Sequence, residues 1–217
     1  VILLANDIVD PYYDWVMSYD NFIATVRKKY TTPQREGLEY AHQTIHHYED
    51  IKGAVIDETN YERYLVSVAM GLATLHKSRL ASSRAVTVED HLVESRKKSL
   101  KLEQAIPMLT TRLRTLLRHL ETDAPSLTPA DHRLIHGDFQ LGNLLALDDR
   151  VAFLDFDDCV QGDPIRDVAN FIVYLHFYDF STTLQQAMST ALLASYRRLV
   201  EWEVSIERLA WHLRVQF

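Results

Sequence analysis

His-Gly-Asp-Phe-Gln-Leu-Gly-Asn, residues 136–143, is the stretch that decides the fold, and Asp155 follows it twelve residues later. Between them, residues 143–147 and 151–156 form two apolar runs, separated by the polar tripeptide Asp-Asp-Arg. Two apolar runs that flank a short polar turn are typical of a β-hairpin. The sequence therefore predicts a hairpin with polar side chains gathered at one end.

The predicted hairpin brings distant polar residues together. Antiparallel pairing sets Asn143 opposite Leu154 or Asp155, and directly opposed residues lie about 4.5–5.5 Å apart. We therefore expect Asn143 and Asp155 to bind one metal ion, with Asp138 on the loop that leads into the first strand. Because side chains alternate along a strand, Asp157 is expected on the same side as Asp155.

These residue types suit phosphoryl transfer, which needs a base for the acceptor hydroxyl and ligands for magnesium. Asp138 is the candidate catalytic base, and Asn143 and Asp155 are the candidate Mg²⁺ ligands, since Mg²⁺ prefers oxygen donors. Asp157 would assist through water, or would be a solvated charge. His136 is expected to hold the loop backbone, with acid–base chemistry as its alternative role.

Composition narrows the class of protein. The chain has 217 residues, 47% of them hydrophobic, a net charge of −7 and the single cysteine Cys159. We expect a full core, no internal disulfide, no nucleic-acid partner and, since no apolar stretch approaches ~18 residues, no membrane span. The chain starts at Val1 without a signal peptide or initiator methionine, so we expect a fragment, or an incompletely covered version, of a longer protein. We expect that protein to be cytoplasmic.

The rest of the chain reads as mostly helical. A capping box at residues 59–62 opens a helix to about residue 76, and a second helical region spans 88–120 with a break near Pro107. Further helices are expected after Pro164, over 183–200 and over 205–217. Asp163 would be the N-cap of the first of these, and Asp167 a buried partner for loop amides.

Two other enzyme classes share part of the aspartate pattern. Haloacid dehalogenase-like phosphatases use an Asp-x-Asp loop but also need a downstream lysine, and the last lysine here is Lys101. Prenyl-diphosphate sites use Asp-Asp-x-x-Asp, which residues 157–161 do not provide. Both classes are therefore excluded.

The three motifs together resemble the aminoglycoside phosphotransferase / choline kinase-like family. These are His-Gly-Asp-x-x-x-x-Asn at 136–143, Leu-Asp-Phe-Asp at 154–157 and Gly-Asp-Pro-x-x-Asp-Val-Ala at 162–169. Residues 71–76 resemble the helix before the catalytic loop, and residues 48–53 resemble the hinge between lobes. The resemblance covers roughly residues 43–217.

The resemblance implies an α+β, protein-kinase-like fold, with a predominantly helical C-terminal lobe at 54–217 that carries the catalytic β-hairpin. It implies ATP or GTP as phosphoryl donor, Mg²⁺, and a small molecule with a hydroxyl as acceptor. It assigns the role of catalytic base to Asp138 and the binding of Mg²⁺ to Asn143 and Asp155. His136, Asp163 and Asp167 would support the loop structurally. The hinge, residues 47–53, would contact the nucleotide base through Tyr48, Glu49 and Ile51.

The sequence departs from the family at its N-terminus. Residues 1–46 read as a remnant or atypical N-terminal lobe, truncated or missing in part, because no Gly-x-Gly loop and no strand lysine can be assigned. One alternative is therefore a degenerate kinase-like module that binds a nucleotide or a partner without catalysis. Another is a kinase for protein serine or threonine. The sequence sets no expectation for the oligomeric state.

Overall fold

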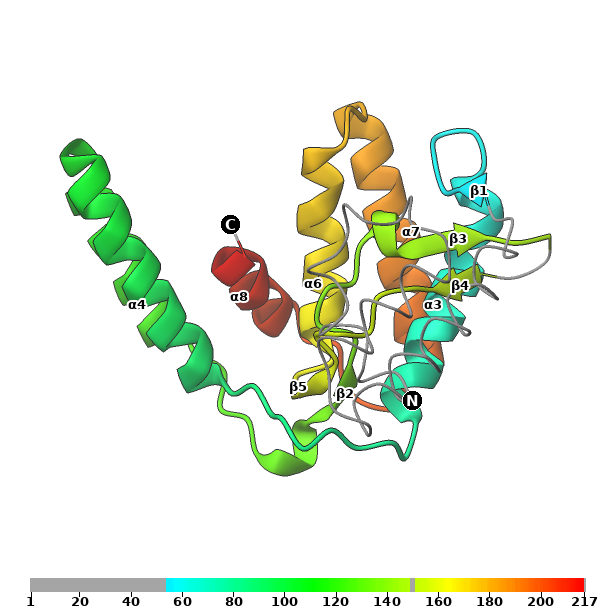
Figure 1. The fold of residues 1–217 in the computed structure, drawn as a ribbon, viewed down its shortest axis with the longest axis horizontal. Helices are drawn as coiled ribbons and strands as arrows, with labels where there is room; N and C mark the ends of the chain where they lie inside the picture. Colours follow the sequence, from blue (N-terminus) through cyan, green and yellow to red (C-terminus); the bar gives the residue numbers. More distant parts are fainter. Residues whose placement is uncertain (1–53, 149–150, 217) are drawn as a thin grey trace, which may run out of the picture. The chain divides into compact units, whose positions relative to one another are not determined.

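The computed structural model describes residues 54–148 and 151–216. Its contacts divide the chain into two units, Val1–Ala54 and Val55–Phe217. The described helices all belong to the second unit (Figure 1): α3 (Tyr61–Lys77), α4 (Val88–Ala105), α5 (Thr110–Thr122), α6 (Ile165–Tyr174), α7 (Thr182–Leu199) and α8 (Ile206–Gln216). The expected N-terminal lobe segment and hinge lie outside the described residues, so the domain boundaries stay predictions.

Helix α3 follows from an apolar stripe at helical spacing. Leu65, Val68 and Leu72 recur at intervals of three and four and are at most 1% exposed. Burial of each such side chain is worth about 1.5–3 kcal/mol. The expected capping box at 59–62 was wrong: Asn60 is the N-cap, makes no side-chain cap bond, and instead accepts the Asp57 amide at 3.0 Å.

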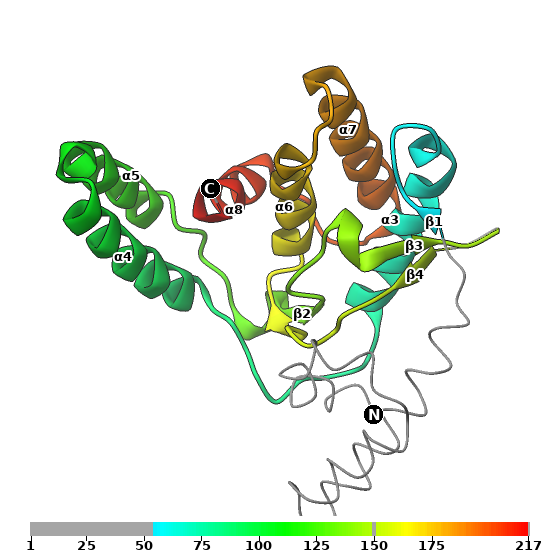
Figure 2. The same ribbon diagram turned by 45° about the horizontal axis from the view of Figure 1, so that its top comes forward.

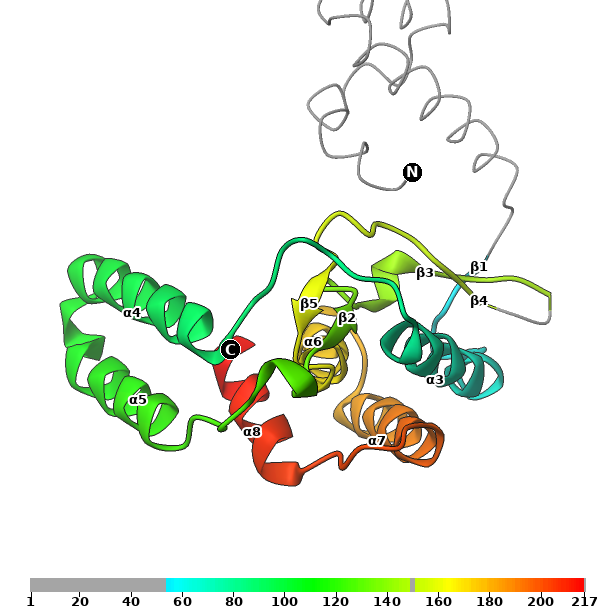
Figure 3. The same cartoon turned by 90° about the horizontal axis from the view of Figure 1, so that it is seen from below.

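Helices α3, α6 and α7 surround the main core. Helix α3 runs beside α7, and α6 contacts both α7 and α8 (Figures 1 and 3). The core side chains that are less than 1% exposed come mainly from these helices and from the segment 136–143: Val68, Ala69, Leu72, Phe139, Ile165, Val168, Ala169, Phe171, Met188, Leu192 and Tyr196. The core therefore lies directly behind residues 136–143.

Helices α4 and α5 form a hairpin of their own (Figure 2). The predicted break is confirmed, because a 3₁₀ turn, η2 (Pro107–Leu109), separates the two helices. Thr87 and Asp90 form a capping box at the start of α4. A small second core of Leu92, Leu120 and Trp211 joins this hairpin to α8, and the Trp211 indole donates to the Leu120 carbonyl at 2.9 Å.

Short strands flank the segment 136–143. β2 (Arg133–Ile135) pairs antiparallel with β5 (Val160–Gly162), and β3 (Leu144–Ala146) pairs antiparallel with β4 (Val151–Phe153). β1 (Ala54–Val55) is the neighbour of β3 in the same sheet. The hairpin prediction is confirmed, but β4 ends at Phe153.

The early end of β4 corrects one argument. Asp155 has φ = 57°, and residues 157–158 form a turn, so strand alternation does not decide the side on which Asp157 lies. The pairing of Leu144 with Phe153 nevertheless sets Asn143 against Leu154, one of the two predicted partners.

The described residues combine helices with two small sheets, which is the predicted α+β class. None of their helices is long and apolar enough to span a bilayer.

Candidate active site

The loop from β2 to β3 carries the candidate base. Gly137 has φ = 88°, in the left-handed region that favours glycine. A Cβ at this position would lie 2.2 Å from the Asp158 carbonyl oxygen. Only glycine therefore allows the backbone turn that places Asp138 where it is.

Two amide side chains orient the Asp138 carboxylate. The Nδ2 group of Asn143 donates to Oδ2 of Asp138 at 3.0 Å and to its backbone carbonyl at 2.8 Å. The Nε2 group of Gln140 donates to the same Oδ2 at 2.9 Å. Both side-chain bonds use Oδ2, so neither occupies Oδ1.

Tyr174 adds a phenol to this site. Burial raises the pKa of the Tyr174 hydroxyl, and the nearby Asp138 carboxylate raises it further. Tyr174 therefore stays protonated near neutral pH and can donate a hydrogen bond towards Asp138. The sequence offered no signal for Tyr174 or Gln140 beyond their being polar.

Asn143 links the base to the aspartates that follow β4. Its backbone carbonyl accepts a hydrogen bond from the Leu154 amide at 2.9 Å. Asp155, whose side chain is exposed, comes next in the chain, one residue beyond this bond. Because Nδ2 of Asn143 is bonded to Asp138, its Oδ1 is the atom that can bind a cation.

Asp155 and Asp157 lie in an acidic, strained segment. Asp155 is the only described non-glycine residue with positive φ. Such a conformation costs an Asp about 1 kcal/mol and is most often kept at functional sites. Burial raises the pKa of Asp157, and the charges of Asp155 and Asp158 add to the effect, while Arg84 opposes it.

These oxygen donors fit a shared magnesium site better than a closed protein cage. Among residues 54–148 and 151–216, no three His, Cys, Asp or Glu side chains are grouped to hold a metal ion. Asn143 and Asp155 offer an amide oxygen and a carboxylate, and Mg²⁺ commonly takes one or two carboxylates together with substrate phosphates and waters. The donor chemistry therefore suits Mg²⁺ bound together with a nucleotide.

His136 is buried and hydrogen-bonded to the backbone that follows β4. It is 0% exposed, and its Nε2 lies 2.8 Å from the Leu154 carbonyl, so this nitrogen carries the proton and donates. The ring packs against Phe139 and Phe156. This geometry favours the structural role over acid–base chemistry.

Asp167 is a buried partner for the backbone amides of the loop, as the sequence predicts. It is 0% exposed, and its carboxylate accepts the backbone amides of His136 at 2.7 Å and Gly137 at 2.9 Å. Burial by itself would raise the pKa of Asp167, but bonds from the His76 ring and from these two amides lower it overall. Asp167 therefore stays ionised.

Two supporting residues were missed by the sequence analysis. His76 is 0% exposed and joins Oδ2 of Asp167 at 3.0 Å to the Tyr196 hydroxyl at 2.7 Å. Asn170, one turn after Asp167 on α6, donates to the Gly137 carbonyl at 2.8 Å. A polar residue within an apolar helical stripe was the available signal for both, because such residues are kept where they have a partner.

Asp163 contacts α8 as well as the start of α6. It accepts the Ile165 amide at 3.0 Å, pairs with Arg208 at 2.6 Å and lies 2.9 Å from Nε2 of His212. Burial would raise its pKa, but His212 and Arg208 outweigh it and lower the pKa to about 2. Pro164, rather than Asp163, occupies the N-cap position.

The hinge residues Tyr48, Glu49 and Ile51 lie outside the described part of the chain, so their predicted contact with a nucleotide base stays a prediction. The described structure brings together Asp138, Asn143 and the segment with Asp155, supported by His136 and Asp167.

Solved structures share this fold. An aminoglycoside phosphotransferase, APH(3'')-Id from Streptomyces rimosus, solved with ADP and streptomycin, has a TM-score of 0.51 at 16% identity, over 74% of this chain and 64% of that one. The choline kinase LicA from Streptococcus pneumoniae has a TM-score of 0.51 at 17% identity, over 76% of this chain and 56% of that one. At such identities the likeness establishes the protein-kinase-like fold.

A curated relative shows similarity in sequence. A LicA homologue from Metamycoplasma hominis is 27% identical over 126 residues, which is 56% of this chain and 47% of the relative. The chain thus spans less than two thirds of the length of these relatives.

The family model describes a larger part of the chain than the motifs did. It matches residues 10–204, and so reaches well upstream of residue 43, where the motif resemblance began. With the site geometry and the shared fold, this match shows that the chain belongs to the phosphotransferase enzyme family.

Proposed function

We propose that this protein transfers the γ-phosphoryl group of ATP or GTP to a hydroxyl of a small molecule. The observation that carries the proposal is the Asp138 carboxylate, oriented through Oδ2 by Asn143 and Gln140. A carboxylate positioned in this way can accept the proton of an acceptor hydroxyl through Oδ1 and orient its oxygen for in-line attack.

The remaining residues divide between cation binding and positioning. Asn143 and Asp155 would hold Mg²⁺, with Asp157 behind them, and the ion would neutralise charge on the transferring phosphates. Two residues of α6 fix the backbone of residues 136–137. Asp167 accepts hydrogen bonds from its amides, and Asn170 donates one to the Gly137 carbonyl. Preorganisation of this kind keeps the Asp138 side chain from moving as charge develops.

The solved relatives suggest which acceptors to try. Their printed descriptions include streptomycin and choline kinase activity, so amino-containing alcohols and aminoglycosides form the first acceptor panel. Exposed acidic side chains such as Asp155 and Asp158 next to the site agree with a cationic acceptor.

The test is nucleotide turnover by the full-length protein with each acceptor, followed as ADP or GDP release. We expect Asp138→Asn to lower turnover about 10²–10⁴-fold while leaving nucleotide affinity unchanged. Asp148→Asn, at an exposed position of the same hairpin, is the matched control. Turnover in Asp138→Asn equal to that of the control would exclude Asp138 as the base. Nucleotide binding without any turnover would favour the degenerate module.

A further inference from the structure

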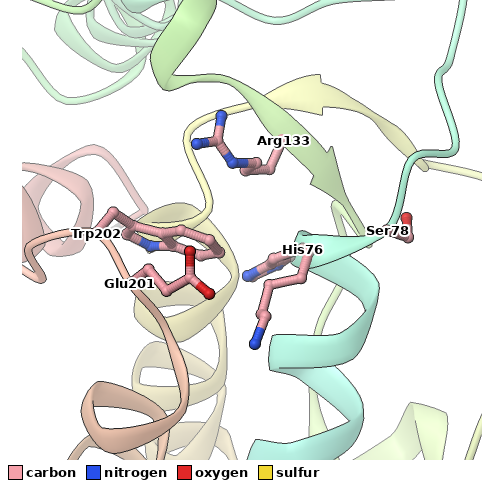
Figure 4. Close-up of a pocket in the computed structure, with 6 residues that line it drawn as sticks. His76, Ser78, Arg133, Glu201 and Trp202 are labelled. Carbon is pink, nitrogen blue, oxygen red and sulfur yellow. The ribbon is translucent and has the colours of Figure 1, made fainter.

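A cavity lies apart from the candidate active site, lined by none of the candidate base or metal residues. Its volume is about 430 Å³, and it is formed by the C-terminal end of α3, the start of β2 and the segment after α7. Figure 4 shows Trp202 on one side of it, His76 on the other and Arg133 above them. The lining residues are His76, Lys77, Ser78, Arg133, Glu201 and Trp202.

The lining carries more positive than negative charge. Lys77 and Arg133 are cations and Glu201 is the single acid among the lining residues, in a chain whose net charge is −7. The Arg133 guanidinium lies 5.1 Å from the centre of the Trp202 ring, which holds it against the wall. Its Nη1 donates to the carbonyls of Ala130 and His132, both at 2.7 Å.

Donors remain for a ligand. A guanidinium has five N–H groups, and the bonds to Ala130 and His132 use those of Nη1 alone. The Oγ atom of Ser78 is buried without a hydrogen-bond partner among the described residues. A buried hydroxyl without a partner costs free energy, which a bound acceptor would recover.

We propose that this cavity binds a small anion, a carboxylate or a phosphate group, between Arg133 and Lys77. A planar guanidinium and an ammonium group are the side chains that best bind such oxygens. Glu201 opposes an anion in the same space, so it limits the affinity. The site is separate from the one that holds Asp138, and its existence does not depend on the proposed reaction.

The cavity is connected to the catalytic loop through His76. This residue lines the cavity, and its Nε2 lies 3.0 Å from the Asp167 carboxylate, which accepts the amides of His136 and Gly137. A ligand that shifts His76 therefore changes how firmly Asp167 holds the loop. An effect of this change on turnover, unlike the binding and the connection themselves, would rest on the proposed function.

The first experiment titrates the full chain with inorganic phosphate and with malonate, followed by calorimetry and by tryptophan fluorescence. We expect saturable binding that changes the fluorescence, with the signal lost in Trp202→Phe while the heat remains. Lys77→Gln and Arg133→Met should each weaken binding about tenfold, and Glu201→Gln should strengthen it. Lys101→Gln, an exposed lysine on α4, is the matched control and should change nothing.

Phosphate could instead bind at the candidate active site, and Asn143→Ala separates the two places. Binding that is lost in Asn143→Ala but kept in Lys77→Gln and Arg133→Met would overturn the proposal, as would the absence of saturable binding. Circular dichroism checks that Arg133→Met is folded, and Lys77→Gln, at an exposed residue, provides the second variant.

A second measurement tests the connection without using activity. Hydrogen exchange of a peptide covering residues 134–140 reports the amides that donate to Asp167. We expect phosphate to change this exchange in the unmodified protein and to leave it unchanged in Lys77→Gln. Phosphate binding with no change in exchange would overturn the connection. This result would leave the proposed function untouched, because that function is tested by the turnover of Asp138→Asn.

Discussion

At the scale of the residue, two unusual backbone conformations shape the candidate site. Gly137 and Asp155 have φ values of 88° and 57°. They differ in chemistry: glycine occupies this region at little cost, whereas an aspartate pays about 1 kcal/mol. The first therefore serves the fold of the loop, and the second keeps a carboxylate in place at some expense of stability.

Replacement of Gly137 by alanine should be severe. The new Cβ would meet the Asp158 carbonyl oxygen at 2.2 Å in a backbone conformation that alanine disfavours. We expect Gly137→Ala to lower the free energy of unfolding by about 2 kcal/mol or more, measured by urea denaturation. Gly142→Ala is the matched control. A Cβ at this position would lie no closer than 3.3 Å to another atom, the Tyr178 hydroxyl oxygen, and Gly142 does not have positive φ. Equal losses in both variants would contradict the steric argument.

Replacement of Asp155 by glycine should separate stability from function. Glycine adopts φ = 57° without strain, which relieves about 1 kcal/mol, but it also adds backbone freedom to the unfolded chain at a cost of about 0.5–1 kcal/mol. We therefore expect Asp155→Gly to leave the free energy of unfolding within about 0.5 kcal/mol of that of the unmodified protein. The same variant should lose magnesium-dependent nucleotide binding, measured by calorimetry with and without EDTA. Asp158→Gly is the control and should lose about 0.5–1 kcal/mol, because Asp158 does not have positive φ and its replacement relieves no strain. Retained magnesium dependence would remove Asp155 from the metal site.

At the scale of the element, two titratable groups join α8 to its neighbours. His91 on α4 packs edge-to-face against Trp211 and His212 of α8. Burial, followed by the charges of Arg166 and His212, lowers the pKa of His91 to about 3, although Asp90 and Asp163 oppose the shift. His91 is therefore neutral in the folded protein at neutral pH.

The contact between α4 and α8 should weaken in mild acid. Below pH 6.5 the unfolded chain takes up a proton at His91 that the folded chain does not bind, so stability falls as the pH drops from about 6.5 towards 3. We expect the melting temperature of His91→Gln to depend less on pH over this range than that of the unmodified protein. Parallel pH profiles for the two proteins would contradict the assignment.

The Asp163 contacts should fail at lower pH. The pKa of Asp163 is lowered from 3.8 to about 2, so its stabilising contribution is present above pH 4 and is lost as the pH falls from 4 to 2. We expect Asp163→Asn to be less stable than the unmodified protein at pH 7 and to differ less from it at pH 2. Urea denaturation at both values measures this difference, with Asp148→Asn as the exposed control. A difference that does not change with pH would mean that the charge of Asp163 is not responsible.

At the scale of the whole molecule, Asp167 is the point where several elements meet. It lies on α6, contacts His76 of α3 and holds the loop at 136–137, while His76 also contacts Tyr196 of α7. Asp167→Ala would leave buried donors without an acceptor. We expect a loss of about 3 kcal/mol in unfolding free energy, measured by urea denaturation against Asp148→Ala. A loss similar to that of the control would show that these contacts are not coupled.

Local patterns predicted the elements well where local forces decide them. The stripe at Leu65, Val68 and Leu72 predicted α3, Pro107 predicted the break between α4 and α5, and the turn at residues 148–150 predicted the hairpin. Each of these is a property of neighbouring residues and needs no distant partner. The capping box at 59–62 failed because Asn60 found a different partner, the Asp57 amide.

The sequence by itself determined the α+β class, the hairpin, and the candidate residues Asp138, Asn143 and Asp155, whose base, metal and nucleotide roles stay predictions. Only the tertiary structure decided that His76 and Asn170 support the loop, that β4 ends before Asp155, and that Asp163 pairs with α8. The physical reason is distance along the chain: His76 meets Asp167 across 91 residues, and Asp163 meets His212 across 49. Contacts of that kind depend on how helices pack, which no local spacing records.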